Sequence, residues 1–96
     1  MSPEMINELE TFCISKKLVG KAESDWFDII IGPAVFCIER RPYYCDRGRF
    51  TLKAFSNDIT KFYIDHSDGF PRYYFVLENL LSELEQYIIF NREKLR

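Results

Sequence analysis

The chain has 96 residues, of which 47% are hydrophobic and 29% charged, and its net charge is −2. This length fits one domain, and both fractions are close to the globular average, which excludes a disordered tail and a collagen-like repeat. The near balance of charge also argues against a protein that holds nucleic acid mainly through a basic excess. Aromatic residues are the compositional outlier, with one Trp, six Tyr and nine Phe.

The sequence predicts a cytoplasmic protein that has no membrane association. Its longest apolar stretch, residues 29–38, is interrupted by Gly32-Pro33 and is shorter than the roughly 18 residues of a membrane helix. The N-terminus is polar and acidic, without the positive and then apolar regions of a secretory signal. Cys13, Cys37 and Cys45 form no CxxC pair, so we expect reduced thiols and neither a metal nor another cofactor.

The first predicted element is a helix over residues 3–18. Ser2 suits the N-cap, Pro3 the first helical position and Gly20 a stop beyond the C-terminal end, as is typical of helix boundaries. Apolar residues then recur at spacings of three and four on one helical face, namely Met5, Ile6, Leu9, Phe12 and Cys13.

Strand-forming residues follow over 26–31 and 34–40. They form either two strands joined by a tight turn at Gly32-Pro33 or one long strand with a bulge at Gly32. Alternation of polar and apolar residues predicts further strands over 49–55, with Phe50, Leu52 and Ala54 on one face, and over 60–65.

The last third favours a helix that begins near Pro71 and carries an apolar stripe. That stripe consists of Leu77, Leu80, Leu81, Leu84 and Ile88. Residues 73–76 favour a strand by propensity, but their position assigns them to the first helical turn. The order of elements predicts a single α+β domain over residues 1–96, with a three- to four-stranded antiparallel sheet flanked by an N-terminal and a C-terminal helix on one face.

The segment 39–49 is the most informative stretch for function. It holds four arginines, Arg40, Arg41, Arg47 and Arg49, around the pair Tyr43-Tyr44, and Arg and Tyr are enriched at binding hot spots. Three interpretations compete: a solvated hairpin whose arginines pair with Asp46, Glu39 and other surface acids, a protein-docking loop, or a nucleic-acid contact. The local excess of two positive charges is small for binding driven by phosphates.

The aromatic residues divide into two groups. We expect Phe12, Phe27, Phe36, Phe50, Phe62 and Phe75 in the core. The tyrosines cannot all be buried, since each hydroxyl needs a partner, so several should reach the surface with Trp26, Phe70 or Phe90. The predicted partner-contacting residues are Arg40, Arg41, Tyr43, Tyr44, Arg47, Arg49, Tyr73 and Tyr74. If Ile89 and Phe90 are exposed, the last helix could also pair with a second copy.

Catalysis is disfavoured. His66 lies in a turn, residues 65–69, and no glycine-rich phosphate-binding motif is present. The acidic groups at residues 23–28 and 58–68 are expected to be solvated. We therefore predict a small non-catalytic protein-binding module, such as an adaptor, an inhibitor or an immunity-type protein. The alternatives are a nucleic-acid-associated regulator that uses the same Arg/Tyr segment and, less favoured, a thiol-dependent enzyme that uses Cys45 or His66.

Overall fold

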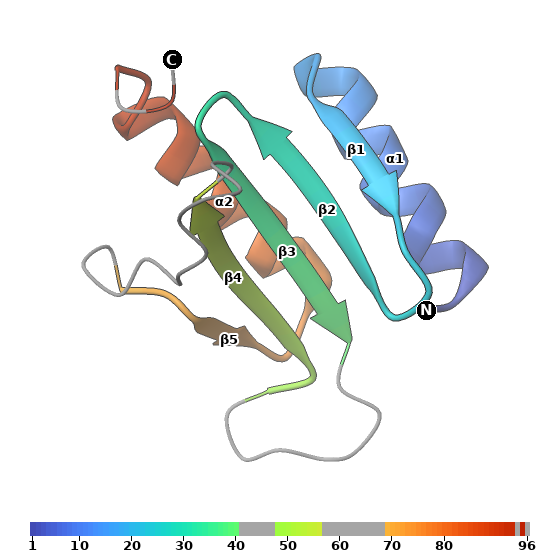
Figure 1. Cartoon of the computed structure of the whole chain (residues 1–96). Coiled ribbons are helices and arrows are strands. Elements are labelled where there is room, and N and C mark those ends of the chain that lie inside the picture. Colours follow the sequence, from blue (N-terminus) through green and yellow to red (C-terminus); the bar gives the residue numbers. More distant parts are fainter. Residues whose placement is uncertain (41–47, 57–68, 94, 96) are drawn as a thin grey trace.

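A computed structural model describes residues 1–40, 48–56, 69–93 and 95 of the chain. Two helices and five strands are present in these residues (Figure 1). In chain order they are α1 (Pro3–Lys16), β1 (Val19–Ala22), β2 (Trp26–Ile31), β3 (Ala34–Arg40), β4 (Phe50–Ser56), β5 (Arg72–Tyr74) and α2 (Leu77–Phe90).

The strands form one antiparallel sheet in the order β1-β2-β3-β4-β5, so that each strand pairs with its neighbours in sequence. Both helices lie behind the sheet in Figure 1, on the same face. The predicted α+β fold with flanking helices is therefore confirmed. Its strand count is higher than the predicted three or four because β1 and β5 are too short to give a periodic signal. The predicted strand over 60–65 lies outside the described residues.

Helix α1 begins as predicted and ends earlier. The Ser2 Oγ accepts a hydrogen bond from the Met5 amide at 3.2 Å, which is the expected N-cap. The helix ends at Lys16, and Lys17 adopts the left-handed conformation with φ 58°. Gly20 is not the stop. It lies in β1, where an added Cβ would approach the Cys13 Sγ and the Phe27 ring to 2.8 Å. Its missing side chain lets α1 pack closely on the sheet.

The Gly32-Pro33 pair forms a turn between two strands, since Ile31 of β2 pairs with Ala34 of β3. The interpretation as one bulged strand is therefore wrong. Along β2, β3 and β4 alternate residues face the helices and are buried, as the predicted alternation in β4 required. The buried residues on this face include Phe27, Ile29, Phe36, Ile38, Leu52 and Ala54.

The predicted start of the last helix is wrong. Residues 72–74 form β5 and pair with Phe50–Leu52 of β4, so the strand propensity of the two tyrosines prevails over their position in the sequence. Helix α2 starts at Leu77. Its N-cap, Val76, makes no side-chain capping bond. The predicted apolar stripe is confirmed, with Leu77, Leu80, Leu81 and Leu84 buried.

One core lies between the sheet and the two helices, and an ion pair between Lys16 Nζ and Glu85 Oε1, 2.7 Å apart, joins α1 to α2. One of the aromatic predictions is wrong, since Phe75, expected in the core, is 56% exposed. Of the three aromatic residues named as surface candidates, Trp26 and Phe90 are exposed and Phe70 is buried. Neither helix in the described part of the chain is long and apolar enough to cross a membrane.

Candidate functional site

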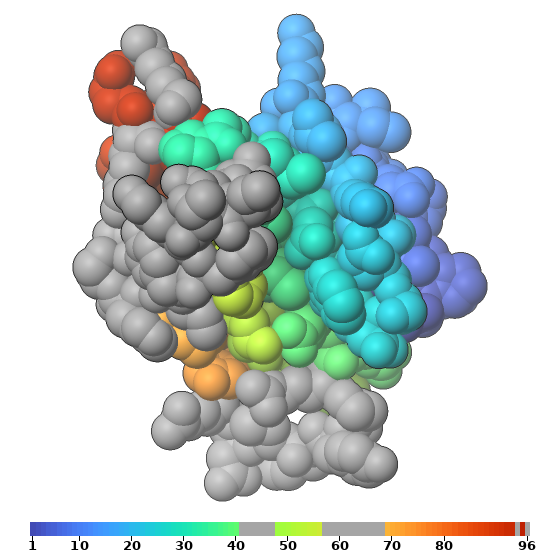
Figure 2. Space-filling model, viewed as in Figure 1, coloured from blue at the N-terminus to red at the C-terminus, as the bar shows by residue number. Residues whose placement is uncertain are grey.

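The sheet face opposite the helices carries three rows of side chains that run across the strands. The strand register places Val19, Ile30, Val35 and Phe55 in an apolar row, Lys21, Asp28, Cys37 and Lys53 in a charged row, and Trp26, Glu39, Thr51 and Tyr73 in an aromatic row. Figure 2 shows this face, with the side chains of β1 and β2 open to solvent at the right of the view.

Burial and neighbouring carboxylates make the Cys37 thiol unreactive. Burial, followed by the carboxylates of Glu39 and Asp28, raises the pKa of Cys37 to about 12 against the opposing effect of Lys53. Burial likewise raises the pKa of the Cys13 thiol, on the buried face of α1. Because the thiolate is the nucleophile, neither thiol suits a catalytic role near neutral pH. Cys45 and His66, the predicted alternatives for catalysis, lie outside the described residues.

The aromatic row lies at the end of the sheet where β3 ends and β4 begins. Arg40 pairs with Phe50 one position beyond this row, and the Arg49 amide donates to the Tyr74 carbonyl at 2.9 Å. Both arginine side chains are exposed. We name Trp26, Glu39, Arg40, Arg49 and Tyr73 the loop-end surface. Trp26 and Tyr73, three strand spacings apart, are separated by about 14 Å.

The contacts of Glu39 test whether this residue pairs with the arginines, as the solvated-hairpin interpretation expects. Glu39 Oε1 lies 2.8 Å from Lys53 Nζ and also accepts a long hydrogen bond from the Cys37 thiol at 3.8 Å. In the part of the chain that the structure describes, no ion pair engages Arg40 or Arg49. Glu39, one of the acids expected to neutralise the arginines, is thus paired with a lysine.

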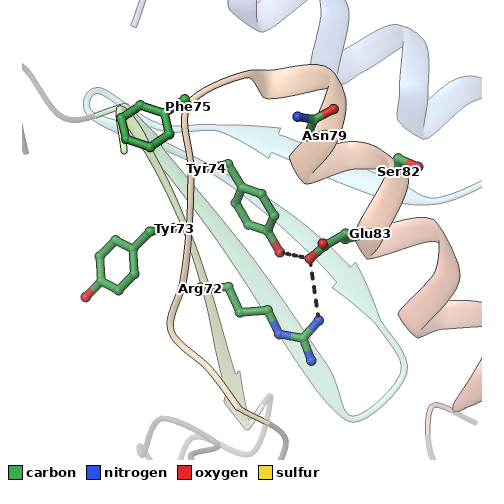
Figure 3. Close-up of a pocket in the computed structure, with 7 residues that line it drawn as sticks. All are labelled: Arg72, Tyr73, Tyr74, Phe75, Asn79, Ser82 and Glu83. Carbon is green, nitrogen blue, oxygen red and sulfur yellow. Dashed lines mark hydrogen bonds and ion pairs between the residues drawn. The ribbon is translucent and has the colours of Figure 1, made fainter. Parts of the chain in front are cut away.

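Four predicted contact residues, Arg41, Tyr43, Tyr44 and Arg47, lie outside the described residues. Gly48, which follows them, is buried against β5 at φ 139°, where a Cβ would collide with the Tyr74 backbone. This contact fixes the start of β4 beside β5. The structure therefore gathers Arg40, Arg49 and Tyr73 at one end of the sheet. Tyr73 lies on the face opposite the helices, whereas Arg40 is in register with Phe50 and Tyr74 on the helix side, and Figure 3 shows Tyr74 pointing toward α2.

A second surface lies between β5 and α2 (Figure 3). An open hollow of about 620 Å³ is lined by Arg72, Tyr73, Tyr74 and Phe75 from the β5 segment and by Asn79, Ser82 and Glu83 from α2. A second hollow, of about 350 Å³, continues past Arg72 and Glu83 to Gln86, Tyr87, Phe90 and Asn91. Since the two hollows share Arg72 and Glu83, they form one groove, which we name the α2 groove.

The walls of the α2 groove are held in place by stacking and hydrogen bonding. The Arg72 guanidinium lies 4.4 Å from the centre of the Phe70 ring, within the range of a cation–π contact. The Tyr74 hydroxyl donates to Glu83 Oε2 at 2.6 Å, and Arg72 Nη1 lies 4.0 Å from the same oxygen. Burial and this hydrogen bond raise the pKa of Tyr74.

Sequence reasoning found Tyr73 and Tyr74 but missed the rest of the α2 groove. Arg72 and Glu83 were not named as site residues, and Phe75 was expected in the core. The available signal was on α2, where Asn79, Glu83, Gln86 and Phe90 recur at the spacing of one helical face opposite the leucine stripe. Among the residues that the structure describes, no group of three or more potential ligands could hold a metal ion.

No protein-family model, curated protein or solved structure matches this chain. The two surfaces therefore have to be interpreted from their own chemistry.

Proposed function

We propose that this chain is a small cytoplasmic, non-catalytic binding module that docks a larger protein through the loop-end surface. The observation that carries the proposal is the exposure of Arg40 and Arg49, without an ion pair among the described residues, at the same end of the sheet as Trp26 and Tyr73. Arginine can bind a carboxylate with two parallel hydrogen bonds, and aromatic rings supply apolar contact area. The complementary partner presents carboxylates next to an apolar side chain.

Acidic groups around the arginines favour a protein partner over nucleic acid. Asp25 and Glu39 line a hollow of about 570 Å³ together with Arg40, and Asp28 lies in the adjacent row. These carboxylates would repel a phosphate backbone but can be matched by a protein that carries both signs of charge. An adaptor or inhibitor that recruits or blocks its partner would need no more than such a surface.

The test starts with capture by a C-terminally tagged chain from native-host lysate treated with nuclease. The captured protein is then purified and titrated against the wild type, the Arg40→Ala/Arg49→Ala double variant and a Lys17→Asn control. Lys17 is an exposed basic residue at the end of α1, outside the loop-end surface and the α2 groove, and asparagine tolerates its left-handed backbone conformation. The proposal predicts a loss of affinity of at least about 30-fold for the double variant, and a change within about twofold for Lys17→Asn.

Three outcomes would contradict the proposal. Equal affinity of the double variant and the control would show that the loop-end surface is not the contact. Capture that disappears with nuclease, with an affinity that falls steeply with salt, would favour the nucleic-acid alternative. Failure to capture any protein would remove the support for a docking function.

A further inference from the structure

We infer that the α2 groove is a dimer interface, in which two copies of this chain pair through antiparallel α2 helices and Phe90 of each copy enters the groove of the other. This inference goes beyond the proposed function and uses a different surface. It joins a protruding aromatic side chain to a preformed hollow on the same helical face.

The side chain that enters the groove of the second copy is Phe90, which is 80% exposed at the end of α2. Ile89 beside it is also exposed, so the condition under which the sequence predicted pairing with a second copy is met. An exposed phenylalanine on a monomer surface is unfavourable, since burying such a side chain gains roughly 1.5–3 kcal/mol. The end of α2 thus presents an apolar anchor to a partner.

The hollow that would receive Phe90 of the second copy lies at the other end of the same helix. Tyr73, Tyr74 and the exposed ring of Phe75 supply its aromatic wall, and its polar lining consists of Arg72, Asn79, Ser82 and Glu83. Asn79 and Phe90 lie on one stripe of α2 and are about 16 Å apart along its axis. A twofold axis that crosses α2 at the level of Leu84 and Glu85, on the side of the Asn79–Phe90 stripe, therefore brings Phe90 of each copy against Asn79 and the hollow of the other.

The same twofold axis pairs the polar residues without a like-charge contact. Glu83 then faces Gln86 of the second copy. The Oε2 of Glu83 accepts a hydrogen bond from the Tyr74 hydroxyl of its own chain, and the Oε1 of Glu83 can accept one from the Gln86 side-chain amide of the second copy. Glu83 of one copy does not oppose Glu83 of the other, because they are offset along the helix. Antiparallel alignment also places the two helix dipoles in their favourable orientation.

The ends of the helix are complementary in charge. Glu78 in the first turn of α2 and Arg92 just beyond its end are both exposed. In the described residues neither takes part in an ion pair. Glu78 lies on the flank of the Asn79–Phe90 stripe, about 100° around α2 from Asn79, and Arg92 lies in the turn beyond the helix. Around an axis at the level of Leu84 and Glu85, each Arg92 comes to the same height as Glu78 of the second copy, where the two long side chains can meet along this flank, and symmetry creates this pair twice. Charge complementarity therefore favours a second copy as the occupant of the groove.

The test is sedimentation of the full chain over a concentration series. The wild type should show a monomer–dimer equilibrium. Phe90→Asp should raise the dimer dissociation constant at least about 100-fold, because one substitution removes two equivalent contacts. Ile14→Asp, which places the same charge at an equally exposed position of α1, is the control and should leave the dissociation constant unchanged.

Charge reversal tests the geometry. Glu78→Arg alone should weaken the dimer about fivefold, and the double variant Glu78→Arg/Arg92→Glu should restore it, since both reversed charges then face each other. A wild-type chain that stays monomeric at millimolar concentration would overturn the inference. So would a dimer that Phe90→Asp leaves intact, or one that the double reversal does not restore. Arg40→Ala/Arg49→Ala should dimerise normally, which keeps this result separate from that of the proposed function.

Discussion

Ile14 on α1 and Phe90 on α2 are almost equally exposed, at 78% and 80%, but their surroundings differ. Ile14 lies opposite the buried face of α1, among Glu10, Thr11 and Lys17 at helical spacing, and lines neither hollow of the α2 groove. Phe90 lines that groove, with polar and charged residues matched along the same stripe. An exposed apolar side chain thus becomes informative only when it lies beside a complementary hollow.

The two helices should contribute equally through their buried faces. Leu9 of α1 and Leu84 of α2 are both fully buried. We expect Leu9→Ala and Leu84→Ala each to lower the free energy of unfolding by about 2–5 kcal/mol, through lost burial and the cavity left behind. Urea denaturation of both variants in a Phe90→Asp monomer would measure this. A Leu84→Ala effect below about 1 kcal/mol, far less than the cost of a buried cavity, would mean that α2 is held mainly by contacts outside the core.

The α1 side should be the less tolerant of added volume. Gly20→Ala places a Cβ 2.8 Å from the Cys13 Sγ and the Phe27 ring, and overpacking of this kind costs about 1–3 kcal/mol. Thermal denaturation should detect the loss. Lys21→Ala, at the adjacent exposed position, should stay within about 0.5 kcal/mol of the wild type. Equal stability of Gly20→Ala and Lys21→Ala would show that α1 packs more loosely on β1 than described.

The helix caps should respond in opposite directions. Ser2→Ala removes the capping bond to the Met5 amide and should cost about 1 kcal/mol. Val76 is an extended N-cap without a side-chain bond, so Val76→Asp should stabilise the protein by about 0.5–1 kcal/mol. Denaturation midpoints of the two variants measure the difference. A destabilising Val76→Asp would indicate that the Val76 side chain packs against its surroundings.

Tyr74, which packs beside α2, should make the free energy of unfolding depend slightly on pH in the alkaline range. Its pKa is raised in the folded chain, so the folded state holds the phenolic proton more tightly than the unfolded state. The free energy of unfolding should therefore fall as pH rises past the ordinary tyrosine value of about 10.

The experiment for Tyr74 uses a Cys37→Ala background, which removes a thiol whose raised pKa has the same effect. Tyr74→Phe should cost about 0.5–1.5 kcal/mol at pH 8 through the lost hydrogen bond to Glu83. The difference from the background should shrink between pH 10 and 11. A constant difference over this range would place the tyrosine hydroxyl in water rather than against Glu83.

Much of the fold could be predicted because its signals are local. Ser2, Pro3 and the spacing of Met5 and Leu9 define α1, and alternation defines β4. The predictions from sequence failed where tertiary contacts determine the local structure. Nothing near Gly20 in sequence shows that it lies beneath Cys13 and against Phe27, and Tyr73-Tyr74 become a strand because β4 offers an edge to pair with.

The candidate surfaces were harder to predict than the fold for the same reason. The arginines of the loop-end surface stand out in sequence, but their position at the same end of the sheet as Trp26 depends on the register of β2, β3 and β4. The α2 groove joins Arg72 to Glu83 across a strand–helix boundary that the sequence placed wrongly. Phe90 could be flagged as a conditional contact, whereas its complementary hollow could not.

The most direct test of the contrast between the two helices is a dilution series of amide NMR spectra on the wild-type chain, from millimolar to micromolar concentration. The account predicts shifts that change with concentration along the α2 groove, at Asn79, Ser82, Glu83, Gln86 and Phe90, while α1 around Ile14 stays constant. Changes centred on α1 and β1, or spectra that do not change with concentration, would contradict it.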